Sequence, residues 1–237
     1  MNVFAALLFL VLSLNNNNPS SSSNISSSTF FSTSNLFLIS GDISDILPTN
    51  GFSLIDFKYN NNNIIAYDLG GSEKIRAIWD TYFPEVFGVI YVIDGSDEGR
   101  LEEAGDLLRS IISNKDLKGK PILILLNKKD QENFIFLSAE VSLANEPLAV
   151  SHSSQEICSA IRGTGKFIDP AIKDGFNWLL ENIFNDYEKL QCDIENALKL
   201  LKQRHDEEKL RRNHRLNQIV SRFVHFIYNS PISAFFS

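Results

Sequence analysis

Residues 87–130 read FGVIYVIDGSDEGRLEEAGDLLRSIISNKDLKGKPILILLNKKD, and this stretch decides the fold. It contains two uninterrupted apolar runs, Phe87–Ile93 and Pro121–Leu126, which are typical of parallel strands covered on both faces of a sheet. Between the two runs, Ser96 and Asp97 are expected to cap a helix. Its apolar residues recur at helical spacing and are Leu101, Ala104, Leu107, Leu108, Ile111 and Ile112. The alternation predicts a doubly wound α/β sheet, whose ligands bind beyond the carboxyl ends of the strands.

The same alternation extends to both sides of this stretch. Upstream, Phe52–Lys58 and Ile64–Tyr67 flank the run Asn60–Asn63 and are predicted to form a hairpin. Downstream, a second helix is predicted from a set of apolar positions at helical spacing, Ile172, Phe176, Leu179, Leu180 and Ile183. The predicted domain therefore covers residues 42–186.

Composition limits the classes of function. The chain has 237 residues, 43% of them hydrophobic, which excludes a wholly disordered protein. Its net charge of −7 argues against broad binding to nucleic acid. A site for one nucleotide is compatible with that charge, because such sites use backbone N–H groups and one or two cations. The two cysteines, Cys158 and Cys192, form no disulfide framework and favour a reducing, cytoplasmic environment.

Residues 1–41 carry no charged side chain and form a separate segment. The apolar run Met1–Leu14 is compatible with a buried strand, with a signal-like or membrane-touching segment, or with an incorrectly assigned start of the coding sequence. The Ser/Asn-rich tract that follows, to about Asn35, is of low complexity and is predicted not to order by itself.

A charged helix with weak coiled-coil character is predicted for residues 187–222, followed by an apolar tail at 223–237. Its two seam columns are Ile183, Leu190 and Ala197, and Tyr187, Ile194 and Leu201. The heptad pattern fails at Arg204 and Glu208 after about three heptads. This helix either packs back on the domain or binds a partner helix.

Three short motifs each follow a predicted strand or precede the hairpin: PTNGF at 48–52, DLGG at 68–71 and NKKD at 127–130. A weaker fourth is CSA at 158–160. A threonine hydroxyl can bind Mg²⁺, an aspartate can hold a metal-bound water, and a glycine lets its N–H approach a phosphate. The carboxylate of NKxD can accept two hydrogen bonds from guanine, which adenine cannot supply. Two structural alternatives stay open: Asp68 as a helix cap, and 127–130 as a plain turn.

Together these motifs resemble the Arf/Arl branch of Ras-like small GTPases. The resemblance rests on PTNGF, on DLGGSEKIRAIWDTYF at 68–83, on IYVIDGSD at 90–97 and on KGKPILILLNKKD at 118–130. Within the branch the chain is most similar to the type 13 ADP-ribosylation factor-like proteins, a ciliary subfamily. The resemblance implies a Ras-like G domain, α/β, with a mostly parallel sheet, an antiparallel interswitch hairpin and helices on both faces. A C-terminal helical extension follows that domain.

The resemblance also implies GTP or GDP and Mg²⁺ as cofactors. It assigns Thr49 to Mg²⁺, Asp68 to a metal-bound water and the Gly71 N–H to the γ-phosphate. The NKxD motif would hold guanine, with the Ala160 N–H on the guanine carbonyl. The implied nucleotide-binding residues are Asp68, Gly70, Gly71, Ser72, Asn127, Lys128, Asp130, Ser159 and Ala160.

By resemblance, the partners are effectors and another Arf-like GTPase, whose nucleotide exchange the chain would promote in the cytoplasm or cilium. Arg76, Trp79 and the helix at 186–215 would bind them. Structural roles compete with this interpretation, since Trp79 could be a core residue and Arg76 could pair with Asp80 or Glu73. Membrane association stays open, but no lipidation site is found, because Asn2 occupies the position where myristoylation requires glycine.

The resemblance breaks at the phosphate loop, GxxxxGK[ST]. It aligns with residues 13–20, where Ser13 and Asn18 replace the glycines and Pro19 replaces the lysine. Proline has neither a positive charge nor an N–H, whereas Ser20 still offers a hydroxyl to Mg²⁺. Losing one charge-assisted bond and one backbone donor weakens nucleotide affinity by roughly 10²–10³-fold.

Ser72 stands where many Arf-like proteins have the glutamine that orients the attacking water. We therefore expect a regulatory protein that binds guanine nucleotide with little intrinsic hydrolysis, and leave open whether it acts as an enzyme. The alternative is a pseudo-GTPase, an interaction module that binds no nucleotide. A third alternative is an ordinary phosphate loop hidden by a wrong first exon, which sequencing the 5′ end of the transcript would reveal.

Overall fold

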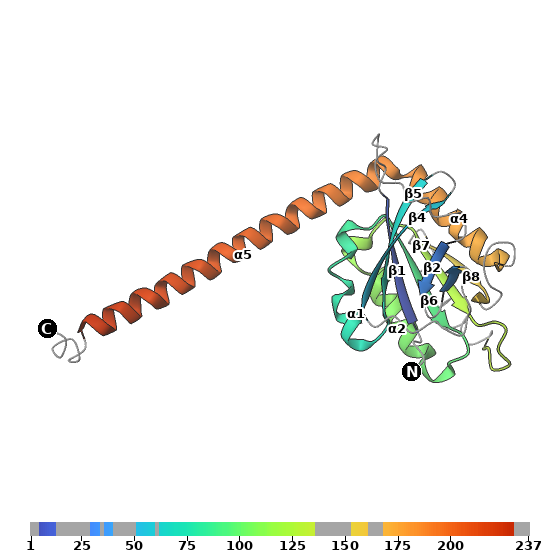
Figure 1. Cartoon of the computed structure of the whole chain (residues 1–237), viewed down its shortest axis with the longest axis horizontal. Helices are drawn as coiled ribbons and strands as arrows, with labels where there is room; N and C mark the ends of the chain where they lie inside the picture. The colour runs from blue at the N-terminus through green and yellow to red at the C-terminus, as the bar shows by residue number, and fades with distance from the viewer. Residues whose placement is uncertain are drawn as a thin grey trace. The chain divides into compact units, whose positions relative to one another are not determined.

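A computed structural model describes residues 5–12, 29–33, 36–39, 51–59, 62–135, 153–160 and 168–229 (Figure 1). The described strands form one large sheet in the order β4-β5-β1-β6-β7-β8 and a separate pair, β2-β3. The large sheet contains β1 (Ala5–Leu12), β4 (Phe52–Tyr59), β5 (Asn62–Leu69), β6 (Gly88–Asp94), β7 (Ile122–Asn127) and β8 (Ser153–Ile157). The small pair contains β2 (Thr29–Thr33) and β3 (Leu36–Ile39).

Helices cover both faces of the large sheet. The described helices are α1 (Glu73–Trp79), α2 (Leu101–Ile112), α4 (Pro170–Asn185) and α5 (Tyr187–Asn229). Three short 3₁₀ turns lie at η2 (Phe83–Glu85), η3 (Glu98–Arg100) and η4 (Lys115–Leu117). The predicted strands at 87–93 and 121–126 and the predicted helices after them are therefore confirmed.

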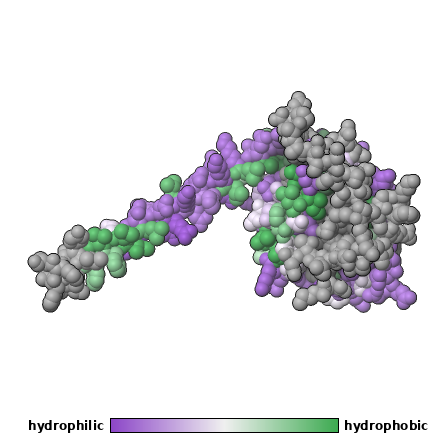
Figure 2. All heavy atoms as spheres, viewed as in Figure 1, coloured by the Kyte–Doolittle hydropathy of each residue, from purple (hydrophilic) through white to green (hydrophobic). Residues whose placement is uncertain are grey.

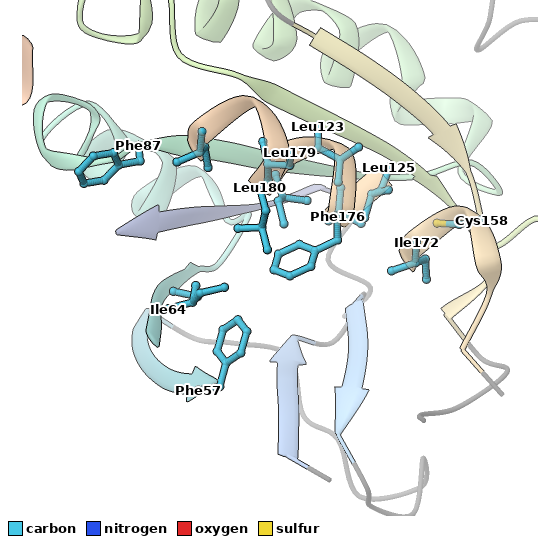
Figure 3. Packing of buried hydrophobic residues seen from close by; sticks show 14 of the residues in the cluster. Phe57, Ile64, Phe87, Leu123, Leu125, Cys158, Ile172, Phe176, Leu179 and Leu180 are labelled. Atoms are coloured by element: carbon cyan, nitrogen blue, oxygen red, sulfur yellow. The ribbon is translucent and has the colours of Figure 1, made fainter. Parts of the chain in front are cut away.

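The continuous apolar runs of β6 and β7 are buried along their whole length, because each strand contributes to two cores. One core packs alternate sheet residues such as Ile90 and Leu123 against α4 and the start of α5 (Figure 3). The other packs the opposite alternation, such as Tyr91 and Ile124, against α1 and α2. The sheet is thus the middle layer of three.

The interswitch hairpin is confirmed as β4 and β5. These strands pair antiparallel from Phe52 opposite Leu69 to Tyr59 opposite Asn62. The register makes the ladder longer than the sequence pattern indicated, since Asn62 and Asn63 belong to the strand. The hairpin places the carboxyl end of β5 beside the sheet edge where β6 and β7 also end.

Strand β1 confirms the strand interpretation of the apolar N-terminal run. It lies between β5 and β6 and runs antiparallel to both, with Leu7 opposite Leu69 and Leu12 opposite Ile64. This is a difference from the expected mostly parallel sheet, since the described parallel pairings are β6-β7 and β7-β8. The physical reason is that an apolar run fits a central slot in either direction, because both pairings satisfy the backbone hydrogen bonds.

Two local predictions need correction. The low-complexity tract does not stay without structure throughout, because β2 and β3 pair antiparallel from its apolar end onward. Ser96 and Asp97 do not cap α2. The Ser96 hydroxyl donates to the Asp94 carboxylate at 2.6 Å, Asp97 pairs with Arg100, and the turn η3 precedes the helix.

Helix α5 begins in the domain and continues beyond it. Leu190 and Ile194 are buried in the α4-side core, and Tyr187 stacks on Phe87 with ring centroids 5.3 Å apart. The first turns of the helix therefore pack back on the domain, which is one of the two alternatives that the sequence left open. From Glu195 onward the chain forms a second unit, and the helix runs past residue 222 to Asn229.

Candidate functional site

Four strand ends meet along one edge of the sheet. Strands β5 and β6 run in the same direction because both are antiparallel to β1, and β6, β7 and β8 are parallel. Asp68, Asp94 and Asn127 therefore stand at the same edge, with Asp94 directly opposite Asn127. All three are buried at the point where ligands bind in open α/β sheets.

The NKKD and CSA segments form one hydrogen-bonded unit at this edge. The Asn127 side-chain oxygen accepts a hydrogen bond from the Ala160 N–H at 2.9 Å. The Ser159 hydroxyl donates to Asp130 Oδ1 at 2.5 Å. The Cys158 N–H donates to the Leu126 carbonyl, and the Cys158 carbonyl accepts from the Lys129 N–H. These two bonds extend the β7-β8 pairing into the loop. The plain-turn alternative therefore does not describe 127–130, because its side chains are organised by the CSA segment.

Backbone conformation contributes to this unit. Lys128 has a φ of 73°, in the left-handed region that non-glycine residues seldom adopt. The turn leaves the Asn127 amide facing β8 and directs the next residue to the same side, where the Lys129 N–H reaches Cys158. An unfavourable backbone conformation of this kind occurs at functional sites, where the surrounding hydrogen bonds maintain it.

The carboxylate of Asp130 is exposed and ready to accept hydrogen bonds. Partial burial raises its pKa, but hydrogen bonds from Ser159 and Gln131 outweigh this effect and hold the pKa below its usual value. Asp130 is therefore ionised at neutral pH, and as a carboxylate it is an acceptor only. An ionised carboxylate is required to accept two hydrogen bonds from a ligand edge that carries two donors.

Asp169 contacts both segments of this unit and was not identified as a site residue from the sequence. It lies at the N-cap of α4, where Oδ1 accepts from the Ala171 N–H at 3.1 Å. Its Oδ2 accepts from the Ser159 N–H at 3.0 Å and pairs with Lys129 Nζ at 2.6 Å. Burial raises the pKa of Asp169, but these hydrogen bonds outweigh it and lower the pKa. The dipeptide Asp169-Pro170 was the available signal, because it is typical of a helix N-terminus.

Lys128 turns toward the neighbouring strand. Its Nζ pairs with Asp94 Oδ2 at 2.5 Å, and the Asp94 side chain is almost fully buried. The other carboxylate oxygen accepts from the backbone and hydroxyl of Ser96. Asp94 was also missed, although an aspartate at the end of a buried strand beside NKxD was a usable signal.

The segment after NKKD closes over Asp94-Gly95-Ser96. Ile135 N donates to Gly95 O at 3.0 Å, and Asn133 Nδ2 donates to Ser96 O at 2.7 Å. A methyl group on Gly95 would lie 2.3 Å from Phe134 Cε2, so glycine is required by close approach.

The DLGG segment is held by the core and by the hairpin. Gly70 donates its N–H to Gly51 O at 3.0 Å and accepts from Trp79 Nε1 at 3.3 Å. Trp79 is only 3% exposed, so it has the structural role that competed with partner binding. Asp68 is fully buried and does not cap a helix, since α1 begins five positions later with Ser72 as its N-cap.

Three more predicted residues have clear positions. Gly71 is buried beside Gly70, and Ser72 is exposed with no side-chain hydrogen bond to the helix it caps. Arg76 pairs with Glu103 of α2 at 2.6 Å, a partner that the sequence did not indicate. The Arg76 pair therefore links α1 to α2 across 27 positions.

The phosphate-loop and metal assignments fall outside the described residues. Ser13, Asn18, Pro19, Ser20 and Thr49 all lie there. The last described residue before Ser13, Leu12, stands opposite Ile64. Within the described ranges, no group of three or more metal-binding side chains gathers.

A three-layer α/β/α domain with DxxG and NKxD at one sheet edge defines a Ras-like G domain. The model of the ADP-ribosylation factor family matches residues 33–183, and the chain belongs to this family. No helix among the described residues is both long and apolar enough to span a bilayer.

Relatives agree with this assignment. The chain is 30% identical over 174 residues to ADP-ribosylation factor-like protein 13B of Chlamydomonas reinhardtii, covering 72% of this chain and 33% of that protein. It is 32% identical over 146 residues to ADP-ribosylation factor K of Dictyostelium discoideum, covering 61% of this chain and 74% of that protein. The chain thus spans about a third of the algal relative's length.

A solved structure agrees at the level of the fold. The Arl6 BBS3 small GTPase of Trypanosoma brucei, solved with the bound nucleotide analogue GppNp, superposes with a TM-score of 0.51 at 23% identity. The match covers 58% of this chain and 81% of the trypanosome protein.

Proposed function

We propose that this Arf-family chain is a regulatory protein that recognises guanine, holds its nucleotide weakly and hydrolyses it little. The observation that carries the proposal is the joined NKKD–CSA unit, in which Asn127 bonds Ala160 and Asp130 bonds Ser159. Building that unit requires two segments about 30 positions apart to meet with side chains in defined directions. A turn that only connects two segments of the chain does not require these side-chain hydrogen bonds.

The residues present fit the base of a guanine nucleotide. Guanine presents two donors on one edge, N1–H and the exocyclic amine, and an ionised Asp130 presents two acceptors. Asn127 is positioned by Ala160, so its amide orientation is set by the protein before a ligand arrives. GTP or GDP would be held at Asn127, Lys128, Asp130, Ser159 and Ala160, and Mg²⁺ would supply charge neutralisation of the phosphates.

The described residues fit the phosphates less well. Lys128 is engaged with Asp94, and the Asp68 and Asp94 carboxylates at the edge repel anions. We therefore expect nucleotide affinity to be weaker than that of a relative with an intact phosphate loop by roughly 10²–10³-fold.

Hydrolysis is expected to be negligible for a separate reason. Ser72 caps α1 with its side chain exposed, and its hydroxyl is too short to orient a water at a γ-phosphate. The proposed role is therefore a binding switch and not a catalyst.

Titration with mant-GDP and mant-GTP, with and without Mg²⁺, tests the nucleotide proposal. We expect saturable binding with Kd above about 1 μM, which guanosine competes for and adenosine does not. Sub-micromolar binding would contradict the weak-phosphate part.

A pseudo-GTPase is the second candidate function, and Pro19 at the position of the phosphate-loop lysine favours it. In that case the folded protein binds neither mant-nucleotide up to about 1 mM, and its switch elements serve only as an interaction surface. The same titration separates the two candidates, provided that circular dichroism shows the protein folded.

For partners, we propose effectors and a second Arf-like GTPase, whose nucleotide exchange this chain would promote, in the cytoplasm or cilium. The support is the resemblance to type 13 proteins and an exposed apolar surface on β4 and α1. Phe52 (46% exposed) on β4 stacks on Tyr82, which follows α1, at 5.4 Å. Leu54 (55% exposed) on β4 and Ile78 on α1 are also exposed. We name these four residues the switch surface.

Release of mant-GDP from a candidate Arf-like GTPase tests the exchange role. We expect Leu54→Asp, in the switch surface, to abolish acceleration, and Leu216→Asp, on α5 beyond residue 215, to spare it. Equal acceleration by both variants would remove the switch surface from the proposal.

A further inference from the structure

The C-terminal part of α5 carries a continuous apolar face. Figure 2 shows an apolar region toward the end of this helix, after a mostly polar stretch. Its members are all exposed and are Leu216, Ile219, Val220, Phe223, Val224 and Phe226. With 3.6 residues per turn, these side chains lie within an arc of about 160°. The two phenylalanines are 65% and 69% exposed, which is unusual for rings of that size.

The charge of the same region is of one sign. From Lys209 to the end of the chain there is no aspartate or glutamate. The basic residues are Lys209, Arg211, Arg212, Arg215 and Arg222, and all five are exposed. Acidic residues end at Glu208, so the charge is purely basic from Lys209, seven positions before the apolar face begins at Leu216.

We propose that this segment, residues 209–226, is a peripheral anchor that lies flat on an anionic membrane surface. A helix with an apolar arc, basic residues along its borders and phenylalanines on its apolar face has the amphipathic composition that binds at the lipid interface. On the helical wheel Arg215 and Arg222 lie beside one border of the arc, where their side chains can extend to lipid headgroups. This inference is independent of nucleotide binding.

Two features favour a membrane over a second copy of this chain. The heptad seam of the first part of α5 fails at Arg204 and Glu208, and the apolar face starting at Leu216 covers fewer than two heptads. A second copy would bring basic residues against basic residues, because this region offers no carboxylate partner. A lipid surface with anionic headgroups supplies the missing negative charge.

The distribution of the basic residues also favours a membrane over an acidic groove of a protein. Lys209, Arg211, Arg212 and Arg215 spread over about 160° of the helical wheel, with Lys209 and Arg211 farthest apart. A groove requires charges at matched positions, whereas a charged plane attracts a cluster within a Debye length whatever its register.

Flotation of the full chain with vesicles tests the proposal. We expect binding to phosphatidylcholine vesicles that contain about 30 mol % phosphatidylserine, and little binding to phosphatidylcholine alone at roughly 0.15 M salt. Arg215→Gln with Arg222→Gln should lower the partition coefficient about 25-fold, or fivefold for each charge. Phe223→Gln with Phe226→Gln should reduce it by at least about 100-fold.

The matched control is Leu200→Gln with Leu210→Gln, which removes two exposed leucines of the same helix outside the apolar arc. We expect this control to bind like the wild type, with equal helix content by circular dichroism in all variants. Three results would overturn the proposal: equal loss in the control, equal binding to neutral vesicles, or no vesicle binding together with self-association that the phenylalanine variant abolishes. Capture by an acidic protein without vesicle binding would overturn it as well.

Discussion

The Asn127 side-chain oxygen accepts a hydrogen bond from the Ala160 N–H at 2.9 Å, which joins two segments 33 positions apart. A buried backbone donor is satisfied by a buried amide, so each residue depends on the other. Next to this bond, the Ser159 hydroxyl donates to Asp130 and the Ser159 N–H donates to Asp169. The candidate base site is therefore a network whose members should fail together.

Asn127→Ala should destabilise the domain by about 1–3 kcal/mol, because the Ala160 N–H is left buried without its acceptor. Urea denaturation followed by circular dichroism measures the change. Asn133→Ala is a suitable control, since Asn133 is exposed and its amide donates to the nearby Ser96 carbonyl. If both variants cost the same, the Asn127 bond has no special structural role.

Lys128→Met should cost about 1–2 kcal/mol, because the buried Asp94 carboxylate loses its cation while part of the lysine is open to solvent. A double-mutant cycle with Asp94→Asn isolates the pair. The two changes are expected to be less costly together than the sum of the single variants. Additive costs would show that the 2.5 Å contact contributes nothing.

Gly95→Ala should cost about 1–3 kcal/mol, because the new methyl group would overlap the ring of Phe134. Gly99→Ala is the matched control: its methyl group would lie no nearer than 3.8 Å to Asp97. Thermal unfolding of both variants checks this. Adding Phe134→Leu should recover part of the loss in the first variant, and failure to do so would place the strain elsewhere.

Stability should depend on Lys120 at alkaline pH. Burial lowers the pKa of this lysine from 10.5 to about 8, against the opposing effect of Asp116, and its Nζ donates to Phe83 O at 2.7 Å. Between about pH 8 and 10.5 the unfolded chain holds a proton that the folded chain has lost, so stability rises with pH in that window.

The comparison with Lys120→Met separates this effect from other titrations. The free energy of unfolding of the wild type, minus that of the variant, should rise by about 2–3 kcal/mol from pH 7 to pH 10.5. Urea denaturation at a series of pH values supplies both curves. A difference that stays level across the window would contradict the burial effect.

At acidic pH, the ionisation of Asp169 should also make the free energy of unfolding rise with pH. Its folded pKa is lowered below the ordinary 3.8, so its contribution is present above that value and is lost as pH falls through the folded pKa. Asp169→Asn is therefore expected to be destabilising by about 1–3 kcal/mol at pH 7 and much less so near pH 2.5. Equal costs at both pH values would contradict the assigned ionisation.

Patterns of period and spacing predicted most of the layers. The runs at 87–93 and 121–126 became β6 and β7 because each strand is covered on both faces, and helical spacing located α2 and α4. A shared site for the NKxD and CSA motifs was implied by the resemblance, and the parallel pairing of β7 and β8 brings the two motifs together.

Other features depend on information that a local pattern lacks. The direction of β1 does not follow from its sequence, because an apolar run shows the same hydrophobic pattern in a parallel and in an antiparallel strand. The partners of Lys128, Lys129 and Arg76 are carboxylates distant in sequence, and only the tertiary fold brings Asp94, Asp169 and Glu103 to them. The burial of Trp79 likewise results from packing under Gly70.

The central claim is that Asp130 reads the guanine edge, and a change of base tests it most directly. Replacing Asp130 by asparagine keeps an acceptor for Ser159 but converts an acceptor–acceptor edge into an acceptor–donor edge, which complements xanthine. We predict that the wild type prefers mant-GDP to mant-XDP by at least about 100-fold and that Asp130→Asn reverses the preference. Unchanged preference in the folded variant, or no binding of either nucleotide by the wild type up to about 1 mM, would contradict the account.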